Sequence, residues 1–155
     1  GYGANCDAYH MTAPNPDGSG AGKAMKLAMA EAGVQSSEIG YINAHGTSTP
    51  ANDSAEGTSI KYGLGEDYKG AYVSSTKSMT GHLLGAAGGV EAIASLLALQ
   101  HQFIPPTINV TEKDPEIDLN LVINDSIETK LTYAMSNSLG FGGHNAVILM
   151  KRWEA

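Results

Sequence analysis

Cysteine, positive charge and long apolar runs are all scarce in this chain. Cys6 is the only cysteine among 155 residues, which excludes an internal disulfide and fits a reducing, cytoplasmic environment. Nine lysines and arginines stand against sixteen aspartates and glutamates, and the net charge of −7 argues against nucleic acid and anionic membranes as partners. The longest weakly polar run, residues 83–99, contains Glu91 and several glycines, so it is too short and too interrupted to span a bilayer.

The pattern of apolar residues alternates between strand-like and helix-like segments. Strands are expected at 1–9, 39–44, 71–74, 121–124, 133–138 and 146–151, and helices at 20–32, from Asn52 or Asp53 onward, and at 81–100. Gly33 stands where a helix end is expected, and the glycine-rich turn 140–143 joins the last two strands as an antiparallel hairpin. This order predicts one α/β domain with a mostly parallel sheet.

Three short motifs match known signatures only in part. Residues 20–24 lack the first glycine and the final Ser or Thr of a phosphate loop. Residues 140–143 lie between two strands, whereas a dinucleotide site requires a strand-to-helix turn. Ser74 and Lys77 have the Ser-x-x-Lys spacing of an acyl hydrolase, but its companion motifs are missing. The five histidines form no closely spaced pair, so no metal site is expected.

Two histidines that follow strand-like segments form the candidate site. His45 comes after 39–44, and His82 comes after 71–74 and directly before the long predicted helix. The dipole of that helix would lower the pKa of His82 and keep the ring neutral. Two neutral imidazoles aimed at one oxygen would stabilise an enolate, and Lys77 could hold a carboxylate or orient a histidine. The remaining histidines are expected to be structural hydrogen-bonding residues: His10, His101 and His144.

Four separated segments resemble the β-ketoacyl-acyl carrier protein synthases, above all the type II elongating enzymes of fatty-acid synthesis. They are His-Gly-Thr-Ser-Thr-Pro at 45–50, Asn-Asp-Ser-Ala-Glu at 52–56, Ser-Thr-Lys-Ser-Met-Thr-Gly-His at 75–82 and Asn-Ser-Leu-Gly-Phe-Gly-Gly at 137–143. The resemblance covers the whole chain, as the C-terminal half of such an enzyme. It implies a thiolase-like α/β fold, with a mixed five-stranded sheet between helices in three layers and residues 1–155 forming the C-terminal domain.

The resemblance also implies an acyltransferase activity. The reaction would be the decarboxylative Claisen condensation of malonyl-acyl carrier protein with an acyl thioester in fatty-acid elongation. By motif, His45 and His82 would assist decarboxylation and stabilise the enolate, and Lys77 would order the site. Because phosphopantetheine arrives on the carrier protein, no cofactor of the chain itself is expected.

Four further residues receive roles from the same resemblance. Thr47 and Thr49 would hydrogen-bond the phosphopantetheine arm. Phe141 resembles a gating phenylalanine whose backbone N–H contributes to an oxyanion hole. Glu91 resembles a buried supporting glutamate, and a purely structural role as a hydrogen-bonded core residue is the open alternative for it.

The nucleophilic cysteine of the family belongs to the N-terminal half, which this sequence does not contain. Cys6 lies inside strand-like sequence, so we expect a small buried side chain and no acyl-enzyme from this chain alone. The start at Gly1 instead of Met also fits a piece of a longer polypeptide. The expected partners are the N-terminal half, a second copy in a homodimer, and acyl carrier protein. Because the carrier is acidic and this chain has few cations, its main docking surface should lie on the other half, and charge reversal at Lys61 or Lys69 should barely change its affinity.

Other functions remain open at this point. The chain could be a non-catalytic partner of the chain-length-factor type, although the joint presence of His45, Lys77 and His82 argues against that. It could serve polyketide instead of fatty-acid synthesis. A Ser–Lys acyl hydrolase built on Ser74 and Lys77 is a third alternative.

Overall fold

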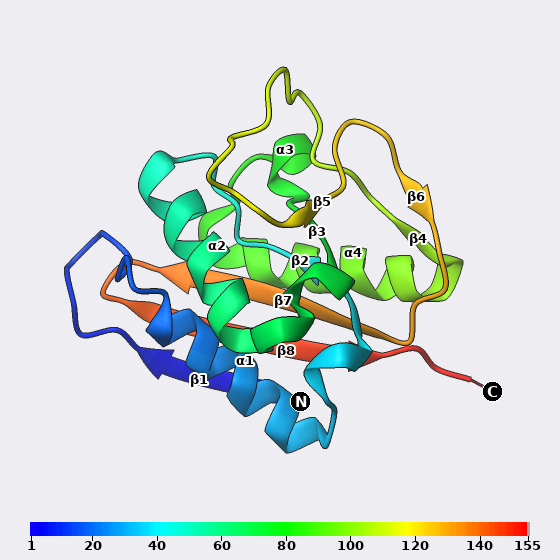
Figure 1. Cartoon of the computed structure of the whole chain (residues 1–155), viewed down its shortest axis with the longest axis horizontal. Helices are drawn as coiled ribbons and strands as arrows, with labels where there is room; N and C mark the ends of the chain where they lie inside the picture. The colour runs from blue at the N-terminus through cyan, green and yellow to red at the C-terminus, as the bar shows by residue number, and fades with distance from the viewer. Residues whose placement is uncertain (155) are drawn as a thin grey trace.

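The computed structural model describes residues 1–154 and has a mixed six-stranded sheet at its centre (Figure 1). The strand order is β1-β8-β7-β2-β3-β5. Its members are β1 (Tyr2–Cys6), β2 (Ile39–Asn43), β3 (Tyr72–Ser74), β5 (Asn120–Leu121), β7 (Tyr133–Gly140) and β8 (His144–Lys151). Strands β7, β2, β3 and β5 are parallel neighbours, whereas β1 and β7 each pair antiparallel with β8. The α/β prediction is confirmed, with a two-residue edge strand, β5, beyond the five strands that the resemblance implied.

Helices cover both faces of the sheet, so the expected three layers are present. Figure 1 shows α1 (Ser19–Ala32) and α2 (Pro50–Leu64) on one face and α4 (Ala87–His101) on the other. Apolar residues of α1, spaced three and four apart, make its inner face: Ala21, Ala24, Met25, Ala28 and Met29. As predicted, α1 ends at Gly33, which has a left-handed φ of 66°. A second core lies on the α4 side and includes Tyr41, Leu99 and Ile104.

Short elements complete the described chain. They are the 3₁₀ turns η1 (Ser36–Glu38), η2 (Gly65–Gly70) and η3 (Leu84–Ala86), the single-turn helix α3 (Lys77–Thr80), and a small antiparallel sheet of β4 (Phe103–Ile104) and β6 (Ile127–Glu128). Among residues 1–154, no helix has the length and apolar character needed to cross a membrane.

Two predicted helix boundaries are wrong. The second helix begins at Pro50, with Thr49 as its N-cap residue, because proline fits the first helical position, where no N–H is needed. The predicted helix 81–100 is divided into α3, η3 and α4. Gly81 and Leu84 have φ values of 70° and 53°, which a right-handed helix does not accommodate. His82 therefore lies in the break and not at the first turn of α4.

The topology brings the candidate residues to one edge of the sheet. Asn43 at the end of β2 pairs in register with Ser74 of β3 and with Ser136 of β7. Because these strands are parallel, the segments that follow them leave the sheet at the same edge, which is where α/β proteins place their ligands.

Candidate active site

The rings of His45 and His82 lie in contact. His45 is in the loop after β2, and His82 follows α3. Their ring centroids are 5.3 Å apart and the ring planes meet at 85°, edge to face. The structure thus brings together the two histidines that were chosen from separate segments. His45 is buried, with 6% of its surface exposed, whereas His82 is exposed.

Burial keeps the His45 ring neutral. Loss of solvent is the largest cause of a pKa lowered to about 3, and the nearby charges of Lys77 and His82 lower it further. A neutral ring carries one N–H donor and one acceptor nitrogen. Its Nδ1 is buried and has no hydrogen-bond partner among residues 1–154.

A local hydrogen bond orients the His82 ring, and His82 does not occupy the N-terminus of α4 on which the helix-dipole prediction depended. The backbone N–H of Leu84 donates to Nδ1 of His82 over 3.1 Å. With Nδ1 as acceptor, the neutral form of the ring carries its proton on Nε2. The break at 81–86 therefore determines which nitrogen of His82 can donate.

Lys77 and Glu91 form a buried ion pair behind the histidines. Nζ of Lys77 on α3 contacts Oε1 of Glu91 on α4, and the two side chains are 4% and 2% exposed. Such a pair resists loss of either partner, because the remaining charge would be buried alone. Of the two roles considered for Lys77, holding a carboxylate and orienting a histidine, the structure shows the first, with Glu91 as the carboxylate. Oε2 of Glu91 has no hydrogen-bond partner in the described part of the chain.

Glu56 is a site residue that sequence reasoning missed. Its buried carboxylate on α2 accepts the backbone N–H groups of His45 and Gly46, each over 2.8 Å, and Nδ2 of Asn137 over 3.1 Å. Burial raises the pKa of Glu56, and these hydrogen bonds oppose that rise. The carboxylate thereby fixes the loop that carries His45. The signal in the sequence was a charged residue at the spacing of the buried face of α2, which also includes Asn52, Ser59 and Ile60.

A pocket of about 690 Å³ opens beside His82. Thr47, Thr49 and Lys77 are among its lining residues, together with the loop 107–114. The hydroxyl groups of Thr47 and Thr49 lie 2.9 Å apart and hydrogen-bond each other. The two threonines predicted from the sequence therefore line the same pocket as His82.

Phe141 lies in the turn between β7 and β8, at the same edge of the sheet, and is 76% exposed. The turn is held to the loop after β1, because Gly142 N–H donates to the carbonyl of Met11 over 2.6 Å. Asp7 N–H also donates to the carbonyl of Gly143 over 2.8 Å. The structure does not place Phe141 among the residues that line the pocket.

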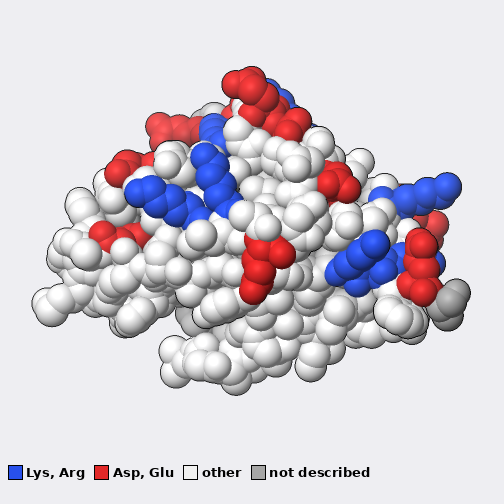
Figure 2. All heavy atoms as spheres, turned by 90° about the horizontal axis from the view of Figure 1, so that it is seen from below, with Lys and Arg blue, Asp and Glu red and all other residues white. Residues whose placement is uncertain are grey.

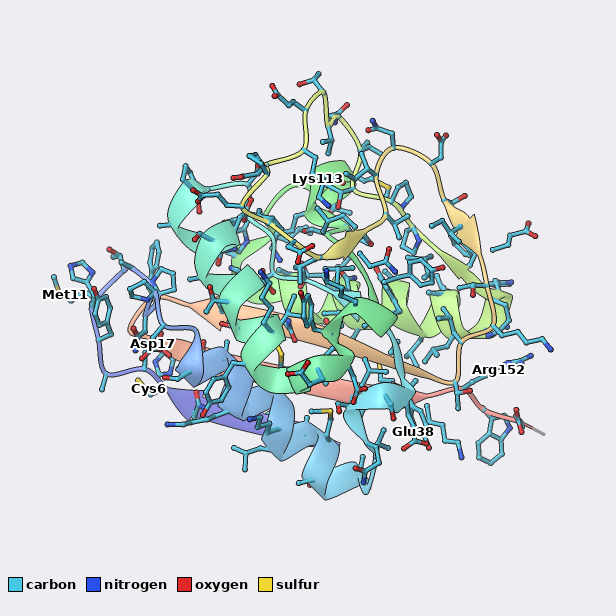
Figure 3. The ribbon with its side chains drawn as sticks, viewed as in Figure 1. Cys6, Met11, Asp17, Glu38, Lys113 and Arg152 are labelled. Atoms are coloured by element: carbon cyan, nitrogen blue, oxygen red, sulfur yellow. The ribbon has the colours of Figure 1, made fainter. Side chains whose placement is uncertain are left out.

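Cys6 is exposed, so its expected burial is wrong. Gly3 of β1 faces α1, since a Cβ there would meet backbone atoms of Ala24 and Ala28. Residues alternate along a strand, so Cys6 is on the same side as Tyr2, which no helix of the described chain covers. Figure 3 shows Cys6 at the end of β1, near the loop that carries Met11. Its thiol donates to the carbonyl of Gly142 over 3.1 Å.

The Ser–Lys hydrolase site is not formed. Oγ of Ser74 donates to the carbonyl of Pro105 over 2.6 Å and lies 3.0 Å from the hydroxyl of Tyr41. Lys77 is occupied by Glu91. Residues 1–154 also hold no group of three or more His, Cys, Asp or Glu that could bind a metal ion.

Comparison with known proteins identifies close relatives. A family model described as "Beta-ketoacyl synthase, C-terminal domain" matches residues 1–111. The 3-oxoacyl-[acyl-carrier-protein] synthase 2 of Staphylococcus aureus (strain COL) is 55% identical over 155 residues, which are 100% of this chain and 37% of that protein. The synthase of the same name from Synechocystis sp. is 51% identical over 154 residues, 99% of this chain and 37% of the relative. The chain thus spans little more than a third of the length of these relatives.

Solved structures of ketosynthases also resemble this chain over almost its whole length. A ketosynthase in complex with its type II PKS acyl-carrier protein matches 99% of this chain and 38% of its own, with a TM-score of 0.96 and 38% identity. The ishigamide ketosynthase/chain length factor matches 99% of this chain and 37% of its own, with a TM-score of 0.93 and 43% identity.

Proposed function

Because the chain belongs to the β-ketoacyl synthase family, we propose that residues 1–155 form the C-terminal half of a 3-oxoacyl-acyl carrier protein synthase of fatty-acid elongation. The observation that supports this most is the contact between a buried neutral histidine and a second histidine beside a pocket. The identity to the two 3-oxoacyl-[acyl-carrier-protein] synthases is higher than the identity to the two ketosynthase structures, which favours fatty-acid over polyketide synthesis.

In this proposal the two rings donate hydrogen bonds to one thioester oxygen. The bond between the malonyl Cα and its carboxylate breaks, CO2 leaves, and the electron pair moves into an enolate whose oxygen accepts from Nε2 of His45 and of His82. The enolate carbon then attacks the acyl thioester on the nucleophile, and the thiolate departs. A pKa of about 3 suits this role because the His45 ring stays neutral at neutral pH and donates a hydrogen bond without becoming protonated.

Lys77 has a supporting role. Its charge lowers the pKa of His45, and its pairing with Glu91 holds that charge in one place. We assign Thr47 and Thr49, in the pocket wall, to the phosphopantetheine arm that arrives on the carrier protein. Phe141, on its exposed turn, takes the gating role.

The nucleophile would come from an N-terminal half that covers the outer side of α4. Figure 1 shows α4 on the face of the sheet opposite α1 and α2. Ile93, Leu96 and Leu97 lie three and four residues apart on α4 and are 60%, 49% and 44% exposed. Tyr2 and Ile148 extend this apolar surface onto β1 and β8. An apolar surface of this kind marks an interface.

Acyl carrier protein is proposed to dock mainly on that other half. A carrier protein is bound in one of the similar structures. Figure 2 shows lysine and arginine side chains dispersed among acidic ones on the face it presents, with large uncharged areas between them. Charge reversal at Lys61 is therefore expected to leave carrier affinity unchanged within about twofold.

The test uses the enzyme formed by this chain together with its N-terminal half, called here the complete enzyme. It should release CO2 from malonyl-acyl carrier protein and extend an acyl group by two carbons. His45→Ala and His82→Ala should each lower CO2 release at least about a hundredfold, whereas His101→Ala, at the end of α4, should not. Wild-type turnover without any loss in the two histidine variants would refute the proposal.

A further inference from the structure

The peptide after His45 is held from two sides. On one side, the backbone N–H groups of His45 and Gly46 donate to Glu56. On the other side, the carbonyl of Gly46 accepts the hydroxyl of Ser75 over 3.0 Å. Ser75 belongs to the segment between β3 and α3, which continues through Lys77 to His82. The Ser75 hydroxyl therefore joins the two segments that carry the histidines, at the residue next to His45, and Asn43 and Thr76 join the same segments at the end of β2.

Ser75 is itself fixed in place. Its backbone N–H donates to Oγ1 of Thr107 over 2.9 Å, and its carbonyl accepts Oγ of Ser78 over 2.9 Å. Oγ of Ser78 in turn accepts the backbone N–H of Ile108 over 3.0 Å. Ser75 is only 6% exposed. Its hydroxyl thus contacts the Gly46 carbonyl from a base that is itself held by hydrogen bonds.

The two segments also lie in direct van der Waals contact at this point. A Cβ on Gly46 would stand 2.5 Å from Cβ of Ser75 and 2.7 Å from its Oγ, and Gly46 has a φ of +42°. Only glycine permits so close an approach. At this contact, Ser75 supplies both the packing surface and a hydrogen bond to the residue that follows His45.

We propose that Ser75 is a positioning residue that fixes His45 relative to His82 through the carbonyl of Gly46. This inference rests on the proposed function for its catalytic consequence, but its structural part does not. Removal of the hydroxyl leaves the partly buried Gly46 carbonyl without this donor and loosens one side of the His45 loop. The ring then gains solvent and loses its alignment with His82. Three ionisable groups act on His45 directly: Glu56 on α2, Lys77 on α3 and His82 after α3. Glu91 on α4 pairs with Lys77.

The experiment compares Ser75→Ala with Ser59→Ala in the complete enzyme. Ser59 is a matched control, because its buried hydroxyl donates to the carbonyl of Ala55 within α2, over 2.8 Å, and makes no hydrogen bond to a site residue in the described part of the chain. Ser75→Ala should lower kcat for CO2 release about tenfold with KM unchanged, the size expected from one buried hydrogen bond. Acyl transfer to the nucleophile should keep its wild-type rate, and Ser59→Ala should leave all three quantities unchanged.

An NMR titration of the His45 ring decides the structural part without any assay of activity. In Ser75→Ala the ring should titrate at higher pH than the value of about 3 set by burial, closer to its ordinary 6.5. An unchanged His45 titration and unchanged CO2 release would overturn the inference, as would equal losses in the two alanine variants. If Ser75→Ala does not fold, Ser75→Cys, which retains a weaker donor of similar shape, should give a smaller shift in the same direction. Wild-type enzyme without CO2 release would refute the proposed function, and the titration would still test Ser75.

Discussion

Lys77 and Glu91 meet as an ion pair that is almost completely enclosed, with side chains 4% and 2% exposed. The two residues come from different helices, α3 and α4, so the ion pair holds together the two helices on either side of the segment that contains His82. It links the stability of the fold to the electrostatics of the site, because the charge of Lys77 is one cause of the lowered pKa of His45.

Loss of one member of this pair should be costly. Glu91→Ala leaves the Lys77 ammonium buried without its partner, and the free energy of unfolding should fall by about 3–5 kcal/mol in urea titrations. Glu128→Ala, at an exposed position on β6, should change it by less than about 0.5 kcal/mol. The double variant Lys77→Met/Glu91→Leu should recover most of the stability. A double variant as unstable as Glu91→Ala would show that the cost has another origin.

The neutral state of His45 predicts a pH dependence of stability. The folded-state pKa of about 3 lies below the ordinary value of 6.5, so the unfolded chain binds a proton more readily. The contribution of His45 is therefore fully present above pH 6.5 and is lost progressively as the pH falls from 6.5 toward 3. His45→Gln should flatten the fall in unfolding free energy over this window, whereas His10→Gln should not. Identical pH profiles for wild type and His45→Gln would contradict the assigned pKa.

Glu56 should be needed for the shape of the His45 loop. Glu56→Ala removes the acceptor of two backbone N–H groups, and stability should fall by at least about 1–3 kcal/mol. Hydrogen exchange at the amide of Gly46 should accelerate selectively. Glu66→Ala, in the exposed turn η2, is the matched control. If the Gly46 amide kept its protection from exchange in Glu56→Ala, Glu56 would not be the residue that holds the His45 loop.

Cys6 should behave as an accessible thiol without catalytic function. Iodoacetamide should modify it in this chain, because its side chain is exposed. Incubation with acyl-CoA or acyl-carrier protein should give no acylated species by intact-mass measurement, since Cys6 lies on a strand and not at a strand-to-helix turn. Cys6→Ser should abolish the alkylation. Stoichiometric acylation of Cys6 would show that the chain supplies its own nucleophile.

Structural features that depend on residues close together in the sequence could be predicted, whereas features that depend on contacts between distant parts of the chain could not. His45, Thr47 and His82 stand in local motifs, and Gly33 ends α1 through its own backbone conformation. Glu56 and Asn137 both stand in family-like segments, but the role of Glu56 was missed because it depends on contacts between α2, the His45 loop and β7, which are far apart in the sequence. The exposure of Cys6 depends on which face of β1 receives a covering layer. The break after α3 depends on the backbone of Gly81 and Leu84, whose apolar surroundings looked helical.

The central claim is that two neutral imidazoles donate to one oxygen. Its most direct test is a crystal structure of the complete enzyme with a malonyl thioester analogue that cannot lose CO2. Nε2 of His45 and Nε2 of His82 should each lie within about 3.2 Å of the same thioester oxygen. Nitrogens directed at different atoms of the analogue, or a thioester oxygen held by other groups, would contradict the account.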